Sequence, residues 1–114
     1  MVSLLIVTVS NSCRTEKKYT GGPYYFSGWR DYKIPFEPIG EISLEKAKES
    51  TSYYEAYFDG NGNISIFKKY LNGELEWRDE YIYDKSKKIR CRILKKWDGS
   101  INKQYFDEKG KIIR

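Results

Sequence analysis

The feature that most constrains the fold is a unit that occurs three times in the second half of the chain. In each copy an aromatic run ends in Asp, and a short polar turn leads to an Ile: YFDGNGNI at 57–64, YIYDKSKKI at 81–89 and YFDEKGKI at 105–112. Two tighter turn signals, Asn72-Gly73 and Asp98-Gly99, lie between the copies. Regular turns between aromatic segments are typical of successive antiparallel hairpins.

The segments between these turns alternate apolar and polar residues. Residues 74–83 place Leu75, Trp77, Tyr81 and Tyr83 on one face, interrupted by Asp79. This period of two marks half-buried antiparallel strands, and the aromatic content of 17% suits a pleated surface. We therefore expect a mostly β fold with one short α-helix, in which a twisted antiparallel meander of about six strands covers 53–58, 64–71, 74–84, 88–97, 100–106 and 111–114.

A three-residue loop at Lys85-Ser86-Lys87 predicts the register of the central hairpin. Tyr83 then faces Ile89, Tyr81 faces Cys91 and Leu75 faces Trp97, while on the other face Glu80 meets Arg92 and Glu76 meets Lys96. At both Asn72-Gly73 and Asp98-Gly99 we expect a tight turn with two residues at positive φ.

The first half of the chain is organised differently. Residues 43–50 predict a helix, with Ser43 as N-cap and with Leu44 and Ala47 facing the sheet. Before it, 19–38 is rich in Gly, Pro and aromatic residues. We expect a short strand at 24–26 that ends at Ser27-Gly28, and an extended 33–38 that is at most an edge strand because of its two prolines. This segment should cover a face or edge of the sheet with Trp29, Ile34 and Phe36.

Residues 1–18 are interpreted as an N-terminal apolar segment and linker, and residues 19–114 as one β-rich domain with hairpin repeats at 53–114. The apolar segment is either the end of a bacterial lipoprotein signal with an acylated Cys13, an edge strand, or a frayed terminus. The small residue before Cys13 suits the first interpretation, whereas a short apolar core without a preceding Lys or Arg speaks against it. The lipoprotein interpretation implies the cell envelope, and the alternative is the cytoplasm.

Composition excludes several kinds of chemistry. The chain contains no His, which removes Ser-His and Cys-His catalysis and the commonest zinc ligands. No phosphate loop or nucleotide fingerprint is present. The turn at Asp59 resembles a calcium loop, but Tyr70 and Leu71 stand where that loop needs Glu. We expect no metal, no cofactor and no enzymatic activity.

The pattern Tyr-Phe-Asp-x-x-Gly-x-Ile, with Asn-Gly or Asp-Gly turns between its copies, resembles bacterial YD-type and MORN-like β-hairpin repeats. It departs from them in the second copy, where Lys87 replaces the turn Gly. Together with Tyr-Tyr-Phe-Ser-Gly and Pro-Phe-Glu-Pro, the chain is also similar to a small family of uncharacterised bacterial single-domain proteins. The repeat resemblance implies a scaffold and transfers no catalytic residue.

The function expected from these observations is a non-enzymatic module that binds a protein or envelope partner. The candidate contact residues are aromatic, each with a place in the core as its alternative: Tyr24, Trp29, Trp77 and Trp97. The net charge of +5 allows a second hypothesis, a cytoplasmic nucleic-acid-binding or toxin-neutralising (immunity-type) protein. It would use the basic strand, through Lys88, Arg90, Arg92 and Lys96, unless acids on 74–80 neutralise these charges. Asp79 either marks a site, sits at a bulge or at the rim of the sheet, or bonds Tyr hydroxyls or Lys95.

Overall fold

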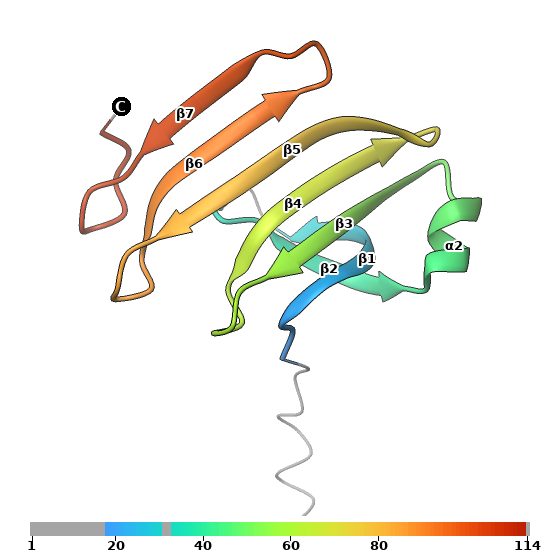
Figure 1. Cartoon of the computed structure of the whole chain (residues 1–114), viewed down its shortest axis with the longest axis horizontal. Coiled ribbons are helices and arrows are strands. Elements are labelled where there is room, and N and C mark those ends of the chain that lie inside the picture. Colours follow the sequence, from blue (N-terminus) through green and yellow to red (C-terminus); the bar gives the residue numbers. More distant parts are fainter. Residues whose placement is uncertain (1–17, 31–32, 114) are drawn as a thin grey trace, which may run out of the picture.

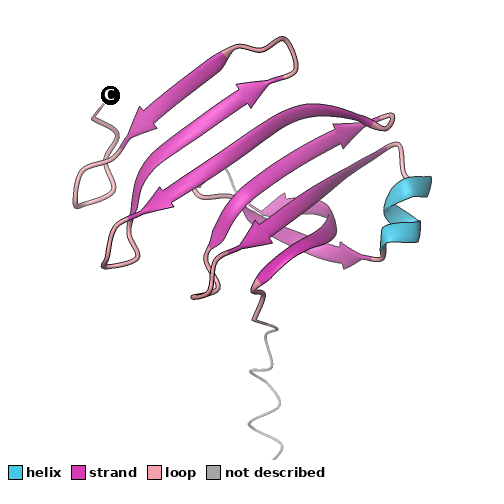
Figure 2. Cartoon of the chain, in the orientation of Figure 1, coloured by secondary structure: helices cyan, strands magenta, loops and turns pink. Residues whose placement is uncertain are grey.

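The computed structural model describes residues 18–30 and 33–113. Within these residues, seven strands form one open antiparallel sheet in the order β2-β1-β3-β4-β5-β6-β7, with one short helix (Figures 1 and 2). The elements are β1 (Gly21–Arg30), β2 (Glu37–Ile42), α2 (Leu44–Glu49), β3 (Ser52–Phe58), β4 (Ile64–Leu71), β5 (Glu74–Tyr83), β6 (Ile89–Lys96) and β7 (Ile101–Tyr105). No helix in the described part of the chain is long and apolar enough to cross a membrane.

The expected meander is present in β3–β7, but the first half of the chain adds two strands to it. β1 pairs with both β2 and β3, so the β1–β2 hairpin extends the sheet. β1 continues through Ser27-Gly28 because Gly28 and Trp29 still pair with Ile39 and Pro38 of β2; the expected end at this point was wrong. β2 is an edge strand that contains Pro38. This agrees with the expectation, because proline has no backbone N–H to donate to a second neighbouring strand. At the other end of the sheet, the expected strand 111–114 is reduced to a bridge between Phe106 and Ile112.

The three Asp turns share one set of hydrogen bonds. In each, an Asp Oδ1 accepts from the backbone N–H groups two and four residues later, at 2.8–3.1 Å. These donors, first those of Lys88 and Lys111, hold the pKa of Asp84 and Asp107 below its ordinary value. The residue that closes each turn has positive φ: Gly62 (87°), Lys87 (66°) and Gly110 (86°). Lys87 therefore adopts the left-handed conformation that Gly adopts in the other two turns.

A bulge after the second of these turns overturns most of the predicted register. Tyr83 pairs with Ile89 as predicted, but the register then shifts by one residue, so that Ile82 pairs with Cys91 and Tyr81 with Arg92. A one-residue shift moves every later side chain to the opposite face. Consequently Arg92, Leu94 and Lys96 share a face with the aromatic side chains of β5. The predicted pairs Tyr81–Cys91, Glu80–Arg92 and Glu76–Lys96 were wrong: Glu80 pairs with Arg78 at 3.3 Å, and Glu76 with Lys69 at 3.1 Å.

The two tight turns differ from each other. Asn72 and Gly73 both have positive φ, 53° and 82°, as predicted. At Asp98-Gly99 only Gly99 does, at 88°, and the N–H of Lys96 donates to the carbonyl of Ser100 at 3.0 Å. This closes a three-residue loop instead of the expected two-residue turn. Trp97 lies in that loop, and its N–H donates to Glu76 O at 3.0 Å, so Trp97 lies opposite Glu76 and not opposite Leu75.

The core lies on the face toward which the sheet curls. We call it the inner face; its buried residues are Phe26, Ala56, Ile64, Phe67 and Tyr81. The β1–β2 hairpin lies behind β3 and β4 in Figure 1 and closes over this face. As expected, Trp29, Ile34 and Phe36 pack against the core.

The helix begins as predicted. Ser43 caps it, and its Oγ accepts from the N–H of Lys46 at 3.1 Å. Ala47 is buried, but Leu44 is 44% exposed and does not face the sheet as expected.

Candidate functional site

A groove opens on the inner face between the β1–β2 hairpin and strands β5 and β6. Its volume is about 290 Å³, and it is lined by Trp29, Phe36, Trp77, Arg92, Leu94 and Lys96. Trp29 comes from β1, Phe36 from the segment before β2, Trp77 from β5, and the remaining three residues from β6. The groove exists because the bulge after Ile89 places Arg92, Leu94 and Lys96 on the inner face.

The aromatic wall of the groove is a set of packed rings. The rings of Trp29 and Phe36 are stacked with centroids 4.5 Å apart. Phe36 lies 6.2 Å from Trp77, which in turn lies 5.8 Å from the buried Phe67 in an edge-to-face arrangement. Phe67 is fully buried and packs against both Phe36 and Trp77, so the core fixes the position of the wall. Such ring pairs add a modest stabilisation beyond the area that they bury.

Behind the groove lies a buried polar network centred on Asp79. The Nε of Arg92 donates to Asp79 Oδ1 at 2.8 Å and to Oδ2 at 3.0 Å, and the hydroxyl of Tyr81 donates to Oδ2 at 2.8 Å. Asp79 is fully buried, and Arg92 also donates to Gln104 Oε1 at 3.1 Å. Burial, followed by the charge of Asp79, raises the pKa of Tyr81 strongly. Among the described residues, no buried side-chain nitrogen or oxygen lacks a hydrogen-bond partner, which is the condition under which a buried charge is tolerated.

Arg92 connects this network to the groove. Its guanidinium carbon lies 5.4 Å from the centroid of the Phe36 ring, within the range of a cation–π contact. The N–H of Phe36 also donates to the Tyr81 hydroxyl at 3.4 Å. The segment that covers the groove is therefore tied to the same residues that hold Arg92.

Lys96 differs from the other cations of this face. It pairs across the strands with Trp77 and is exposed. On the other side of Trp77, Lys69 is neutralised by Glu76 at 3.1 Å. Among residues 18–30 and 33–113, no carboxylate forms a direct ion pair with Lys96, so the rim of the groove carries one ammonium without a salt-bridge partner. Hydrogen bonds from Ser100 lower the pKa of Asp98 in the following turn, and the charge of Lys96 contributes to this shift.

The structure brings together half of each set of predicted contact residues. Trp29 and Trp77, from the aromatic set, share the groove with Arg92 and Lys96, from the basic set. Phe36 and Leu94 complete it; neither was proposed as a contact residue, although Phe36 was expected to cover the sheet. The sequence signal that could have identified Leu94 is its spacing of two residues from both Arg92 and Lys96, which places all three side chains on one face of β6.

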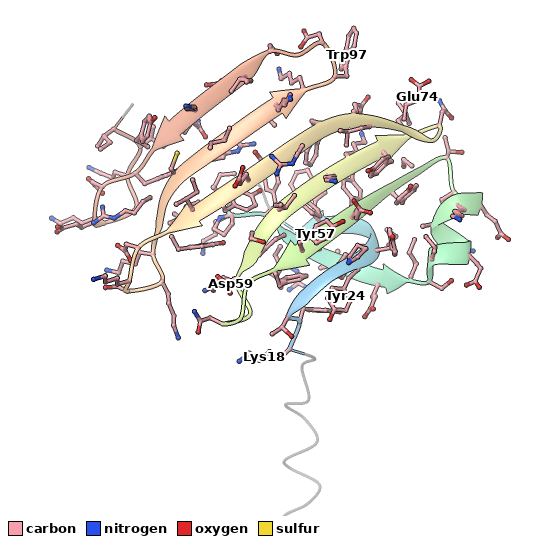
Figure 3. All side chains as sticks on the ribbon, viewed as in Figure 1. Lys18, Tyr24, Tyr57, Asp59, Glu74 and Trp97 are labelled. Carbon is pink, nitrogen blue, oxygen red and sulfur yellow. The ribbon has the colours of Figure 1, made fainter. Side chains whose placement is uncertain are left out.

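The remaining predicted contacts lie elsewhere. Tyr24 packs against Tyr19 and Phe58. Trp97 is 76% exposed in the loop between β6 and β7, beside Glu74 (Figure 3). Arg90 pairs with Asp84 at 2.9 Å, and Lys88 lies 3.5 Å from Glu108 O, so both belong to the turns. Cys13 lies outside the described residues.

The opposite side of the sheet, which we call the outer face, carries a second cluster around Glu55. Lys68 pairs with Glu55 at 3.4 Å and lies 5.5 Å above the ring of Tyr57. Tyr53 stacks on Tyr70 at 5.1 Å. Burial and the charge of Glu55 raise the pKa of Tyr70 to about 12 and also raise that of Tyr53.

No group of three or more metal-ligating side chains occurs within the part of the chain that the structure describes. At Asp59, Oδ1 accepts from the N–H groups of Asn61 and Asn63, both at 2.9 Å, as in a hairpin turn.

The fold and the groove define a small protein built on one open antiparallel β-sheet, with an aromatic groove and a cationic rim on its inner face. A family model described as "Family of unknown function (DUF6156)" matches residues 18–114, and the chain belongs to this family. No curated protein and no solved structure matches the chain. Membership agrees with the expected resemblance to uncharacterised small domains, and the comparisons do not support YD-type or MORN-like repeats.

Proposed function

We propose that this protein is a non-enzymatic binding module that holds a segment of a partner protein in the groove of Trp29, Phe36, Trp77, Arg92, Leu94 and Lys96. The observation that carries the proposal is the meeting, in one groove, of residues from both predicted contact sets. Concave sites that join apolar walls to a few polar groups are the usual form of ligand-binding pockets. Trp and Arg are also enriched among the residues that dominate binding energy.

The packing of the groove supports binding as its role. Its walls are partly exposed aromatic rings, but they rest on the fully buried Phe67 and on the network of Asp79. A wall that is already ordered loses little conformational freedom when a ligand arrives, which favours affinity.

The test is affinity capture from native lysate, with quantitative comparison of variants. Wild-type protein and Trp97→Leu should capture the same partner, whereas Trp77→Leu and Lys96→Glu should capture at least about tenfold less of it. Trp97→Leu is the matched control because Trp97 lies at the end of the sheet, outside the groove. Circular dichroism verifies that each variant is folded. Equal capture by all folded variants would overturn the proposed site.

Single-stranded nucleic acid is a second candidate ligand, favoured by the position of Arg92 and Lys96 beside stacked rings. Binding of this kind weakens steeply as salt rises, because each phosphate contact releases counterions. Oligonucleotide titrations at two salt concentrations test it, with Lys96→Gln against Lys95→Gln as matched variants. A salt slope no steeper than that of a charge-matched unrelated protein removes this candidate.

The envelope version of the proposal depends on Cys13. Expression of the natural gene with a labelled fatty acid should label the protein, and Cys13→Ser should abolish the label. Label that persists in Cys13→Ser, or the absence of label from wild-type protein, would contradict acylation of Cys13.

A further inference from the structure

We infer that the groove selects a peptide segment in which an aromatic side chain lies next to one acidic group, with Lys96 as the residue that determines this specificity. This inference rests on the proposed function and adds the chemistry of the ligand. It follows from which charges at the groove are compensated inside the protein.

Arg92 does not offer a free charge to a ligand. Both oxygens of Asp79 accept from its Nε, and another guanidinium nitrogen of Arg92 donates to Gln104 Oε1. Because Asp79 is fully buried, its negative charge stays beside Arg92 whatever binds outside. The guanidinium therefore contributes a flat surface over Phe36 more than a net positive charge.

Lys96 is the cation that remains for the ligand. It lies directly across from Trp77, so an anion that it binds has a neighbouring group above the indole ring. The next residue back along β6, Lys95, pairs with Arg78 and Ile101 and therefore lies on the outer face. Among the described residues, a second anion in the groove would meet no second ammonium that lacks a direct ion-pair partner.

The size of the groove limits the apolar part of the ligand. A volume of about 290 Å³ lies just below the range of about 300–1,000 Å³ for pockets that hold drug-sized molecules. One aromatic side chain and its neighbouring acid match this space. A strand with one phosphate per nucleotide does not match a groove with one available cation, which favours the peptide over the nucleic acid.

The experiment uses the three blocked peptides acetyl-Asp-Phe-amide, acetyl-Asn-Phe-amide and acetyl-Asp-Phe-Asp-amide as probes. The readout is the indole N–H signals in proton–nitrogen NMR spectra. The chain has three Trp, so in a Trp97→Phe background the two indole signals that remain belong to the groove. Acetyl-Asp-Phe-amide should shift both signals and bind about three- to tenfold more tightly than the isosteric Asn peptide. The second acid should change the affinity less than about twofold.

Two Lys variants of equal charge provide the control. In the same background, Lys96→Gln should remove the preference for Asp over Asn, while Lys95→Gln should keep it. Equal affinity for the Asp and Asn peptides, or equal losses in the two Lys variants, overturns the inference and leaves the groove as a binding site. If no peptide shifts either indole signal, both the inference and the proposed groove fail.

Discussion

The inner and outer faces of the sheet each hold a carboxylate that is paired with a cation beside tyrosines, but the two pairs differ in burial. Asp79 on the inner face is fully buried and lies 2.8 Å from Arg92, whose side chain is 16% exposed. Glu55 on the outer face is 13% exposed and lies 3.4 Å from Lys68, which is 22% exposed. Tyr81 donates to Asp79, and on the outer face the charge of Glu55, after burial, raises the pKa of Tyr70.

The difference shows how burial changes the contribution of an ion pair to the stability of the fold. Lys68 and Glu55 keep some contact with water, so losing the outer pair should cost less than losing the inner one. Asp79 is buried, so water cannot take the place of Arg92 as its partner unless Asp79 becomes exposed. Removing one partner therefore leaves a buried charge without its counter-charge. The inner pair is therefore a requirement of the fold around the groove, and the outer pair, in which neither carboxylate nor ammonium is fully buried, depends less on its partner.

The largest effect is expected from Asp79→Ala, which leaves the buried part of Arg92 without its counter-charge. The free energy of unfolding should fall by about 3–5 kcal/mol, measured by urea denaturation. As a control, the double variant Asp79→Leu/Arg92→Met should recover much of this loss, because it removes both charges from the interior. A loss below about 1 kcal/mol for the single variant would make the two faces equivalent.

Alkaline pH is expected to destabilise the fold through tyrosines on both faces. An unfolded Tyr titrates near 10, whereas burial and Glu55 raise the pKa of Tyr70 to about 12, and burial raises that of Tyr81 strongly. The folded state thus keeps protons that the unfolded state releases. This contribution to stability is complete below pH 10 and is lost as the pH rises through about 12.

Urea denaturation near neutral pH and at about pH 11 measures this loss. The same comparison in Tyr70→Phe separates the faces: its loss between the two pH values should be smaller than that of wild-type protein, and the remainder reports other tyrosines, including Tyr81. An unchanged midpoint at high pH would contradict the raised pKa values.

A conservative exchange of the two cations sharpens the comparison further. Arg92→Lys should lower the free energy of unfolding by about 2 kcal/mol, because Lys cannot bond Asp79 and Gln104 together in the fixed geometry of a guanidinium. Lys68→Arg on the outer face should change it by no more than about 0.5 kcal/mol. Thermal and urea unfolding of the two variants side by side test this, and similar losses at both positions would contradict it.

These contrasts explain which parts of the molecule the sequence could predict. The turns follow from local chemistry, since Asp59, Asp84 and Asp107 bond backbone groups within four residues of themselves. The helix at 44–49 and its Ser43 cap are equally local. The strands β3–β7 follow from alternation and turn spacing, so most of the sheet was predictable.

The groove was not predictable, because it depends on one bulged residue and on a distant hairpin. Alternation along β6 correctly groups Arg92 with Lys96, but it cannot tell which face they share until the bulge after Ile89 is known. Likewise, the position of Trp29 depends on a β1 that continues past Gly28 to pair with β2. Half of the predicted contact residues therefore line the groove. The prediction that placed Arg92 and Lys96 on the face opposite to the aromatic residues of β5 was wrong.

The smallest effect is expected from Glu55→Gln on the outer face. Because the pair with Lys68 is partly exposed, the free energy of unfolding should change by about 1 kcal/mol or less. The pKa of Tyr70 should nevertheless fall from about 12 toward 10, since the charge of Glu55 is its second cause, but it should stay raised because burial comes first. Carbon NMR titration of the Tyr signals measures this shift, with Tyr70→Phe to assign it. The matched control is Glu80→Gln, which removes another outer-face acid, paired with Arg78 at 3.3 Å. If both variants lower the pKa of Tyr70 equally, the effect belongs to the net charge of the face and not to the contact with Glu55.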